Sequence, residues 1–313
     1  MNMFPRDAAT DAAAAGADAG GFKLYHYEPS MAGGAIFTLL FIGTTLLHVW
    51  QLYRGRSWFT IPLTVGGLCK NSRRKTQIES MLIRSSVELV GYAARCKSSN
   101  ETPNWTLGPY IIQSIFLLVA PALFAATIYM ELGRIVQMID GEGRVMISKK
   151  WMTKIFVTGD ILSFFLQGGG GGIQASGTLE ALDTGSKIII GGLFVQLIFF
   201  GVFVVIAIAF HRAIEQNPTG RSTSGLPWKK HMIALYVGSF LIMVRSIFRA
   251  VEYLQGFDGF LLRHEAYLYV FDATLMFLVM VLFNWIHPSE ITNILEERRT
   301  GKGYSMGAFT ECA

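Results

Sequence analysis

Long apolar runs, separated by short polar segments, make up most of the chain. Six of these runs come close to the ~20 residues that an α-helix needs to cross the hydrocarbon core of a bilayer. They cover residues 31–52, 109–132, 153–176, 187–210, 231–252 and 264–286. The pattern predicts an all-α, polytopic membrane protein, because only helices and closed barrels satisfy their backbone polar groups inside lipid.

A seventh span is divided in the sequence. FTIPLTVGGL (59–68) and VELVGYAAR (87–95) are each about half a span, and a basic, polar segment, residues 69–86, lies between them. Removing that segment joins the halves into one helix of normal length, and Cys69-Lys70 can be encoded by TGT-AAG, which contains a splice-donor-like GTAAG. We therefore interpret residues 69–86 as a non-native insertion from a retained intron. The alternative is a cytosolic or re-entrant loop.

The distribution of Lys and Arg predicts the orientation of these seven transmembrane helices. One set of loops, with the C-terminal tail, carries Arg54, Arg56, Arg134, Arg144, Lys149, Lys150, Arg212, Arg221, Lys229, Lys230, Arg298, Arg299 and Lys302. The other set carries Arg6, Lys23, Lys97, Lys187 and Arg263. Because cytoplasmic loops hold the excess of basic residues, we expect the N-terminus outside and the C-terminus in the cytosol.

The topology divides the chain into three regions. Residues 1–23 are rich in Ala, Gly and Asp and predict a disordered extracellular N-terminus. Residues 24–288 form the membrane domain, and residues 289–313 form a cytosolic tail. Two N-glycosylation sequons begin at Asn100 and Asn104, in the second loop, and this loop is expected outside.

Composition supports a membrane protein and argues against other classes. The 313 residues are 51% hydrophobic and 16% charged, which is too apolar for an ordinary soluble domain of this size. The net charge of +5 does not indicate nucleic-acid binding, because the basic residues lie between apolar runs rather than on one stripe. The three cysteines lack metal-ligand spacing, and a nucleotide-binding P-loop motif is absent. We expect no metal site and no cofactor.

Four of the predicted helices carry polar residues on one face, in the i, i+3 or i+4, i+7 spacing of a helical stripe. Polar groups inside a membrane bundle either have a function or tie helices together, and both interpretations stay open for any one pair. The stripes are Asp160, Ser163 and Gln167; Arg245, Arg249 and Glu252; Glu265, Tyr269 and Asp272; and Glu88, Tyr92 and Arg95. They suggest one interior network or cavity.

Depth in the membrane predicts which of these residues meet. Arg245 lies about 21 Å above the inner end of its helix, and Asp272 about 18 Å above the inner edge, so we expect them to pair. Asp160 lies about 10 Å up, where its nearest predicted neighbour is His48. The four histidines near the inner edge, His231 among them, are interpreted as interfacial anchors rather than metal ligands.

Five consecutive glycines, Gly168 to Gly172, follow the Asp160 stripe. The run predicts either close packing of two helices or a local break of the helix that exposes backbone carbonyls. Its members are Gly168, Gly169, Gly170, Gly171 and Gly172. Close packing is favoured about two to one, since small residues let transmembrane backbones approach.

The segment GDILSFFLQGGGGGIQASG (159–177) resembles the signature of the fungal RTA-like, or lipid-translocating exporter, family. The family form has the Asp, Ser and Gln at these spacings, then two small residues and three glycines. Further matches, in the same order as in the family, are YEPSMAGGAIFTLLF (27–41), VELVGYAAR (87–95) and residues 118–136, 245–256 and 264–288. The departures from the family are Gly34, where Asn is frequent, and residues 69–86.

The resemblance implies a seven-helix protein of the plasma membrane or another cell membrane, in a family linked to movement or release of sphingoid long-chain bases and related lipids and to resistance to lipophilic toxicants. Membrane lipids and lipophilic small molecules are the implied partners, with no nucleic acid; a homo-oligomer is possible. Asp160, Glu88 and Asp272 are candidate acids for an ammonium group, with Arg245 and Arg249 as counter-charges. The alternatives are a seven-helix lipid sensor or receptor and, more remotely, a metal-dependent lipid hydrolase. We expect no enzymatic activity and no catalytic residue.

Overall fold

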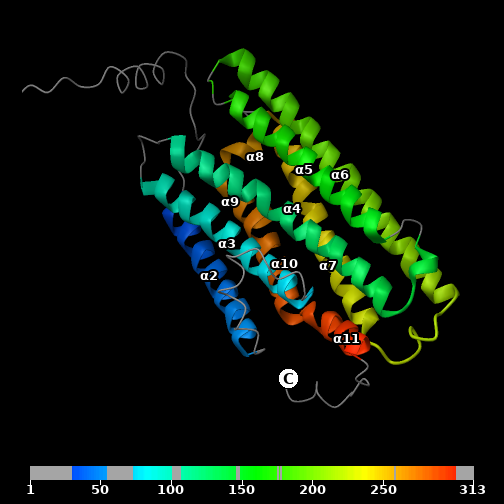
Figure 1. The fold of residues 1–313 in the computed structure, drawn as a ribbon. Coiled ribbons are helices and arrows are strands. Elements are labelled where there is room, and N and C mark those ends of the chain that lie inside the picture. Colours follow the sequence, from blue (N-terminus) through cyan, green and yellow to red (C-terminus); the bar gives the residue numbers. More distant parts are fainter. Residues whose placement is uncertain are drawn as a thin grey trace, which may run out of the picture.

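The computed structural model describes residues 30–54, 73–100, 107–145, 149–174, 176, 178–256 and 259–300, and these form helices and turns with no strand. Long helices lie side by side in an elongated bundle (Figure 1). The first six are α2 (Met31–Arg54), α3 (Arg73–Asn100), α4 (Leu107–Met138), α5 (Lys149–Gln174), α6 (Leu179–Gln216) and α7 (Trp228–Leu254), with the short η2 (Glu142–Arg144) after α4.

The last membrane segment of the bundle, called the last column below, consists of several consecutive helical segments. It runs through α8 (Phe260–Arg263), α9 (Glu265–Leu268), the π-helical turn η3 (Tyr269–Ala273) and α10 (Thr274–Trp285). The chain ends its described part with α11 (Ser289–Thr300). This last helix was not expected, because the sequence predicts only a short polar tail there.

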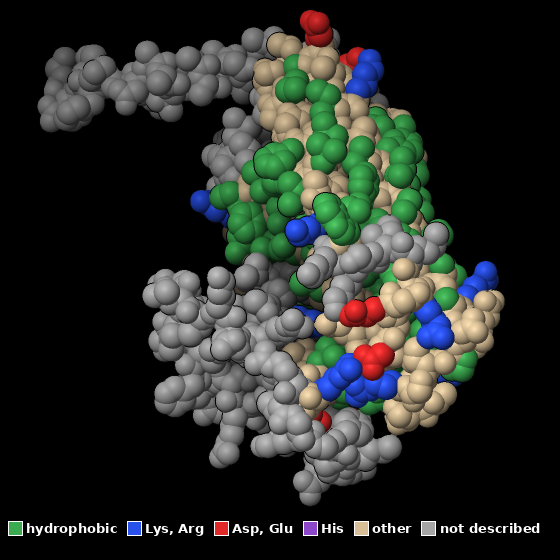
Figure 2. All heavy atoms as spheres, turned by 45° about the vertical axis from the view of Figure 1, so that its right-hand side comes forward, with side chains coloured by type: hydrophobic (Ala, Val, Ile, Leu, Met, Phe, Trp, Pro, Cys, Tyr) green, Lys and Arg blue, Asp and Glu red, His purple; other side chains and the backbone are tan. Residues whose placement is uncertain are grey.

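The helices have the character of a membrane protein. Four helical stretches are long and apolar enough to cross a bilayer, and Met31–Leu47 is a shorter apolar helix. The long stretches are Ile112–Met138, Glu180–Gln216, Trp228–Leu254 and Glu265–Leu295. Large apolar side chains face outward along them, and Figure 2 shows hydrophobic side chains gathered over one broad area, with most charged side chains above or below it. The chain is therefore an integral membrane protein.

Neighbouring helices along the chain pack against each other. The most extensive contact joins α5 to α6; α3 packs between α2 and α4, and α4 also contacts α5 and α7. Most of the buried apolar side chains form one core, to which α4, α6, α7 and α10 contribute most, and a smaller cluster joins α6 to α7. α4 thus lies against α3, α5 and α7, while η3 contacts α7 and α6 packs on both α5 and α7.

Two segments differ in length from the sequence prediction. α6 begins at Leu179, well before the apolar run at 187–210, because the Thr178 side chain caps it by accepting a hydrogen bond from the Ala181 backbone N–H. α3 is continuous from Arg73 to Asn100, so residues 73–86 extend the helix that carries Glu88. FTIPLTVGGL (59–68) lies outside the described residues, and the interpretation of residues 69–86 as an insertion stays a prediction.

Candidate functional site

A cluster of charged side chains lies inside the bundle, where α3, α4, α7 and η3 meet. Arg245 of α7 and Asp272 of η3 form an ion pair, and both are about 95% buried. Glu88 of α3 is 1% exposed and close enough to both of them to interact electrostatically. The pairing of Arg245 with Asp272 that depth predicts is therefore confirmed. We call Glu88, Arg245, Arg249, Glu252 and Asp272 the central charged cluster.

Pro121 explains a second contact of Arg245. Proline has no backbone N–H, so inside α4 it leaves the carbonyl four residues earlier, that of Leu117, without its helical hydrogen bond. The Nη2 atom of Arg245 donates to this carbonyl oxygen at 2.9 Å. In the interior of the bundle, the guanidinium thus binds both a carboxylate and a backbone carbonyl that has no helical hydrogen bond.

Asp272 occupies an unusual backbone position. It lies in the π-helical turn η3, Tyr269–Ala273, and the Thr274 hydroxyl donates to the Tyr269 carbonyl at 2.9 Å. Single π-helical turns inside α-helices occur frequently at functional sites, because they shift side chains around the helix axis and weaken the local hydrogen-bond ladder. The turn therefore presents Asp272 to Arg245 from a helix whose backbone is locally irregular.

The remaining charges of the central charged cluster lie on α7. The Arg249 Nη1 atom donates to Glu252 Oε2 at 2.6 Å, and the Arg249 guanidinium lies 5.1 Å from the centre of the Tyr253 ring. The cluster thus holds three carboxyl groups and two guanidinium groups, and in the described part of the chain Glu88 has no ion pair of its own. The cluster therefore has one buried carboxyl group more than it has guanidinium groups.

Toward one end of the bundle, a second polar group ties α2, α3 and α9 together. Arg95 is fully buried; its Nη2 atom lies 2.6 Å from Glu265 Oε1, and its Nε atom donates to the Tyr269 hydroxyl at 3.1 Å. Glu265 also accepts from the Ser30 backbone N–H at 2.8 Å. The Phe37 ring stacks on Tyr269 with centroids 5.3 Å apart. These contacts bring two of the four predicted stripes together.

The stripe on α5 faces a different neighbour. Ser163 donates to the Gly192 carbonyl of α6 at 2.7 Å, and the Gln167 amide nitrogen lies 2.5 Å from Ser163 Oγ and 3.2 Å from Gln196 Oε1. All of these groups lie in the contact between α5 and α6. The expectation of one interior network is therefore wrong for this stripe: α5 packs chiefly on α6, so Ser163 and Gln167 lie apart from the polar residues that the other three stripes bring together.

The glycine run takes part in this contact. α5 is continuous through Gly168 to Gln174, so the local break, one of the two alternatives, is not observed. A methyl group added at Gly170 would lie 2.7 Å from the Gly185 carbonyl oxygen of α6, whereas one added at Gly169 would meet nothing within 4 Å. Of the run, Gly170 is the residue that needs to lack a side chain for the two backbones to approach.

Asp160 lies against α4 rather than in the polar contact of α5 with α6. It is 4% exposed, and neither of its carboxylate oxygens has a well-oriented hydrogen bond in the described part of the chain. Its polar neighbour is the hydroxyl of Tyr129, which is also buried without another partner there. The side chain of His48, the neighbour predicted from depth, lies outside the described residues.

Comparisons with known proteins cover the part of the chain that contains these polar residues. The family model described as RTA1 like protein matches residues 81–294. The chain belongs to the RTA1-like family. It is 38% identical over 274 residues to Protein RTA1 of Saccharomyces cerevisiae, with 84% of each chain covered. It is 38% identical to Protoporphyrin uptake protein 1 of the same yeast, covering 84% of this chain and 91% of the relative. No solved structure matches the chain.

One more distant RTA1-like relative has a name that states a lipid cargo. The Sphingoid long-chain base transporter RSB1 of Saccharomyces cerevisiae is 23% identical over 301 residues, covering 83% of this chain and 74% of the relative. The matched region of the family model contains the central charged cluster, the polar contact of α5 with α6, and Asp160. The resemblance stated from the sequence motifs is thereby confirmed at the level of the family.

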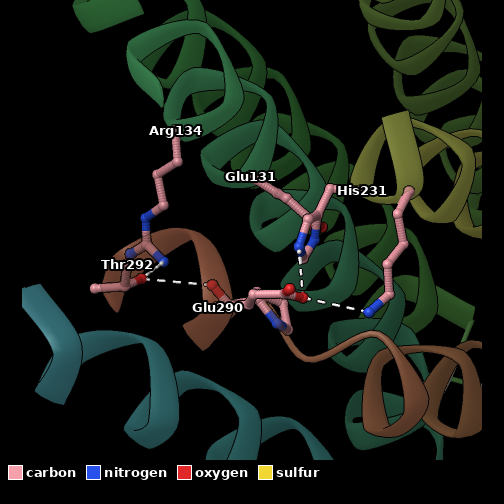
Figure 3. A network of polar contacts seen from close by, with 7 residues as sticks. Glu131, Arg134, His231, Glu290 and Thr292 are labelled. Atoms are coloured by element: carbon pink, nitrogen blue, oxygen red, sulfur yellow. Dashed lines mark hydrogen bonds and ion pairs between the residues drawn. The ribbon is translucent and has the colours of Figure 1, made fainter. Parts of the chain in front are cut away.

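The predicted stripes do not include a further buried polar group of this RTA1-like chain (Figure 3). His231 of α7 is fully buried, with Nδ1 3.3 Å from Glu131 Oε1 of α4 and Nε2 3.2 Å from Glu290 Oε2 of α11. Lys230 also lies 3.3 Å from Glu290 Oε2. The interpretation of His231 as an interfacial anchor is wrong. Glu131, an acid within an apolar run, was the signal available in the sequence.

The predicted glycosylation positions lie at the end of α3 and beyond it. Asn100 is the last residue of α3 and is exposed, whereas Asn104 lies outside the described residues. Lys97 and Asn100 end the helix at the same end of the bundle as the Arg95 and Glu265 pair. Glycosylation of this loop stays a prediction.

Proposed function

We propose that this RTA1-like chain moves single-chain lipid amphiphiles with an ammonium group across the membrane, with sphingoid long-chain bases as the leading cargo. The observation that carries the proposal is the excess carboxyl group of the central charged cluster, Glu88, buried beside the Arg245 and Asp272 pair. A buried charge is stable only when it is paired. An ammonium headgroup supplies the missing cation at Glu88.

The chemistry of a sphingoid base fits the surroundings of Glu88. Such a lipid has a cationic amine, neighbouring hydroxyl groups and one long apolar tail. Tyr92 lies one helical turn from Glu88 on α3, and its hydroxyl is buried without a hydrogen bond in the described chain, so it is available to a cargo hydroxyl. The apolar outer faces of α2 and α3 offer a surface for the tail. The relative RSB1 is named for the same cargo.

The proposal includes a topology of seven spans. α2, α3, α4, α5, α6, α7 and the column from α9 to α10 would each cross the membrane, with the N-terminus outside and the C-terminus in the cytosol. α3 is the least apolar of these helices, because the charged stretch 73–86 begins it and Glu88 and Arg95 follow. We place the protein in the plasma membrane, where export of such lipids would also confer resistance to lipophilic toxicants.

The test is release of labelled sphinganine from yeast cells that express the full chain, compared with a Glu88→Gln variant at equal surface expression. Glutamine keeps the size of the side chain and removes the charge. We expect release above that of empty-vector cells for the parent chain and release near the empty-vector level for Glu88→Gln. The matched control, Glu180→Gln, removes an exposed acid at the start of α6 and should release at the parent rate.

Two outcomes would count against the proposal. Equal release by the parent chain and by empty-vector cells would remove sphinganine as a cargo. Parent-level release by Glu88→Gln would remove the central charged cluster from the path. Saturable binding of sphinganine to the purified chain without any release would instead support the sensor alternative, in which the same site recognises a lipid but does not move it.

A further inference from the structure

Asp160 is isolated from every cation in the described chain. In the sequence it is the only ionisable side chain between Lys154 and Glu180. The facing stretches are equally uncharged: α4 has no charged residue before Glu131, and α6 has none between Lys187 and His211. Its carboxyl group therefore has no basic partner on its own helix or on the two helices packed against it.

The surroundings of Asp160 are aromatic and close-packed. Tyr129 of α4 is fully buried and packs edge-on against Phe203 of α6, with ring centroids 4.6 Å apart. Phe156 of α5, one turn before Asp160, lies 5.4 Å from the same Tyr129 ring. A methyl group added at the adjacent Gly159 would lie 2.5 Å from the Phe199 ring. This packing gives the carboxyl group one polar neighbour, the Tyr129 hydroxyl.

A carboxylate in such a place needs a counter-ion or a proton. An ionised carboxylate buried without a partner is strongly unfavourable, and such a group becomes neutral instead. No basic side chain of the described chain supplies the charge, and the tight aromatic packing favours the smallest cation. We infer that Asp160 and Tyr129 form a proton-binding site, in which Asp160 carries the proton and Tyr129 donates a hydrogen bond to its other oxygen.

The site has a natural role in the translocator proposed above, on which this inference rests. When the packing of α5 on α4 and α6 opens to one side, a hydronium ion gives its proton to the Asp160 carboxylate: one O–H bond of the hydronium breaks and one forms at Asp160. When the packing opens to the other side, the Asp160 O–H bond breaks and a water molecule takes the proton. While the packing is closed, the neutral acid is compatible with its aromatic surroundings. Binding and release of the proton thereby shift the equilibrium between the arrangement of α5 that is open to one side and the one that is open to the other. Lipid movement that needs the same change of α5 is then coupled to a proton gradient.

The first test is infrared difference spectroscopy on the purified full chain, which needs no cargo. A protonated carboxylic acid has a C=O stretching band that an ionised one lacks. We expect Asp160→Asn to lose such a band, and Asp183→Asn, which removes an exposed acid paired only with Lys187 at the start of α6, to keep it. Tyr129→Phe should move the band to higher frequency, since it removes the hydrogen bond to the carbonyl but keeps the ring.

The second test uses vesicles containing the purified chain, labelled sphinganine and an imposed pH gradient, with protein-free vesicles as the baseline. Coupling of one proton to one lipid sets a limiting sphinganine ratio of about tenfold for each pH unit. Because permeation of the neutral amine ends at the same ratio, the readout is the rate, and the parent chain should approach the ratio faster than protein-free vesicles do. Asp160→Asn should approach it no faster than protein-free vesicles.

The outcomes separate this inference from the proposed function. A parent chain that moves no sphinganine would overturn the function, while the infrared band alone would still support the proton site. Survival of the full band in Asp160→Asn, in a variant that elutes as folded protein, would overturn the proton site. Sphinganine movement that ignores the pH gradient in the parent chain would overturn the coupling.

Discussion

The guanidinium of Arg245 donates to the backbone carbonyl of Leu117, the group that Pro121 leaves without a helical partner. The same guanidinium pairs with Asp272 in the π-helical turn η3. One side chain of α7 therefore joins the two places where the backbones of α4 and the last column depart from regular α-helix. A structural change in α4, α7 or η3 should therefore affect the other two elements.

The Arg245 and Asp272 pair should show strong coupling in a double-mutant cycle. Arg245→Met or Asp272→Asn alone leaves a buried group without its partner, and we expect each to lower stability by about 3–5 kcal/mol. The double variant should lose less than the sum, because neither member of the pair is left without the other. Thermal unfolding of the purified chain in detergent measures the three variants. Additive losses would contradict a direct pair.

Pro121→Ala should weaken the link between α4 and α7. Alanine restores the backbone N–H, which then competes with Arg245 for the Leu117 carbonyl. We expect Pro121→Ala to reduce the stability loss that Arg245→Met causes, by roughly the 1–3 kcal/mol of one charged hydrogen bond. The measurement is unfolding of the single and double variants. An undiminished loss in the Pro121→Ala background would separate the proline from Arg245.

Neighbouring glycines of α5 should respond oppositely to alanine. Gly170→Ala places a methyl group 2.7 Å from the Gly185 carbonyl oxygen, and we expect a loss of about 1–3 kcal/mol from overpacking. Gly169→Ala meets nothing within 4 Å and should gain up to about 1 kcal/mol from helix propensity. Thermal stability of the two variants side by side is the check. Equal effects would mean that the α5 and α6 backbones are not in close contact.

His231 should matter far more to stability than its neighbour Lys230, although both contact Glu290. Both His231 nitrogens face carboxylate oxygens, which only accept hydrogen bonds, so both contacts are satisfied by a doubly protonated ring. His231→Ala leaves Glu131 and Glu290 facing each other in the interior and should cost about 3–5 kcal/mol. Lys230→Ala, at a half-exposed pair, should cost about 1 kcal/mol or less. Similar losses for the two variants would show that α11 does not depend on His231.

Asn100 offers a direct test of orientation. If the loop after α3 faces outside, its sequon is available for glycosylation, and Asn100→Gln, alone or with Asn104→Gln, should lower the apparent mass of the expressed chain. Glycosidase treatment of the parent chain should give the same shift. The opposite result would be glycosylation at a sequon introduced near Arg221 and none at Asn100. It would show that the basic loop lies outside, and the topology would be the reverse of the one proposed.

The sequence by itself determined the membrane character, the helical class, the family and the level of the Arg245 and Asp272 pair. The membrane character, the helical class and the pairing depth follow from hydropathy, helical spacing and the fixed rise of an α-helix, which are local properties of the chain. The motifs around Asp160 and Glu88 carried enough order and spacing to indicate the RTA1-like family before any contact was known. The polar residues were likewise identified from their positions alone.

Only the tertiary structure decided which polar stripes meet. A stripe on one helix faces whichever neighbour its packing surface selects, and Gly170 and Gly185 fit α5 closely to α6, so Ser163 and Gln167 bond to α6 and Asp160 is left beside Tyr129. The same dependence on packing hid the buried position of His231 between Glu131 and Glu290, which lie on helices far apart in the sequence. Spacing fixes the face that a residue occupies, whereas packing fixes the group that it faces.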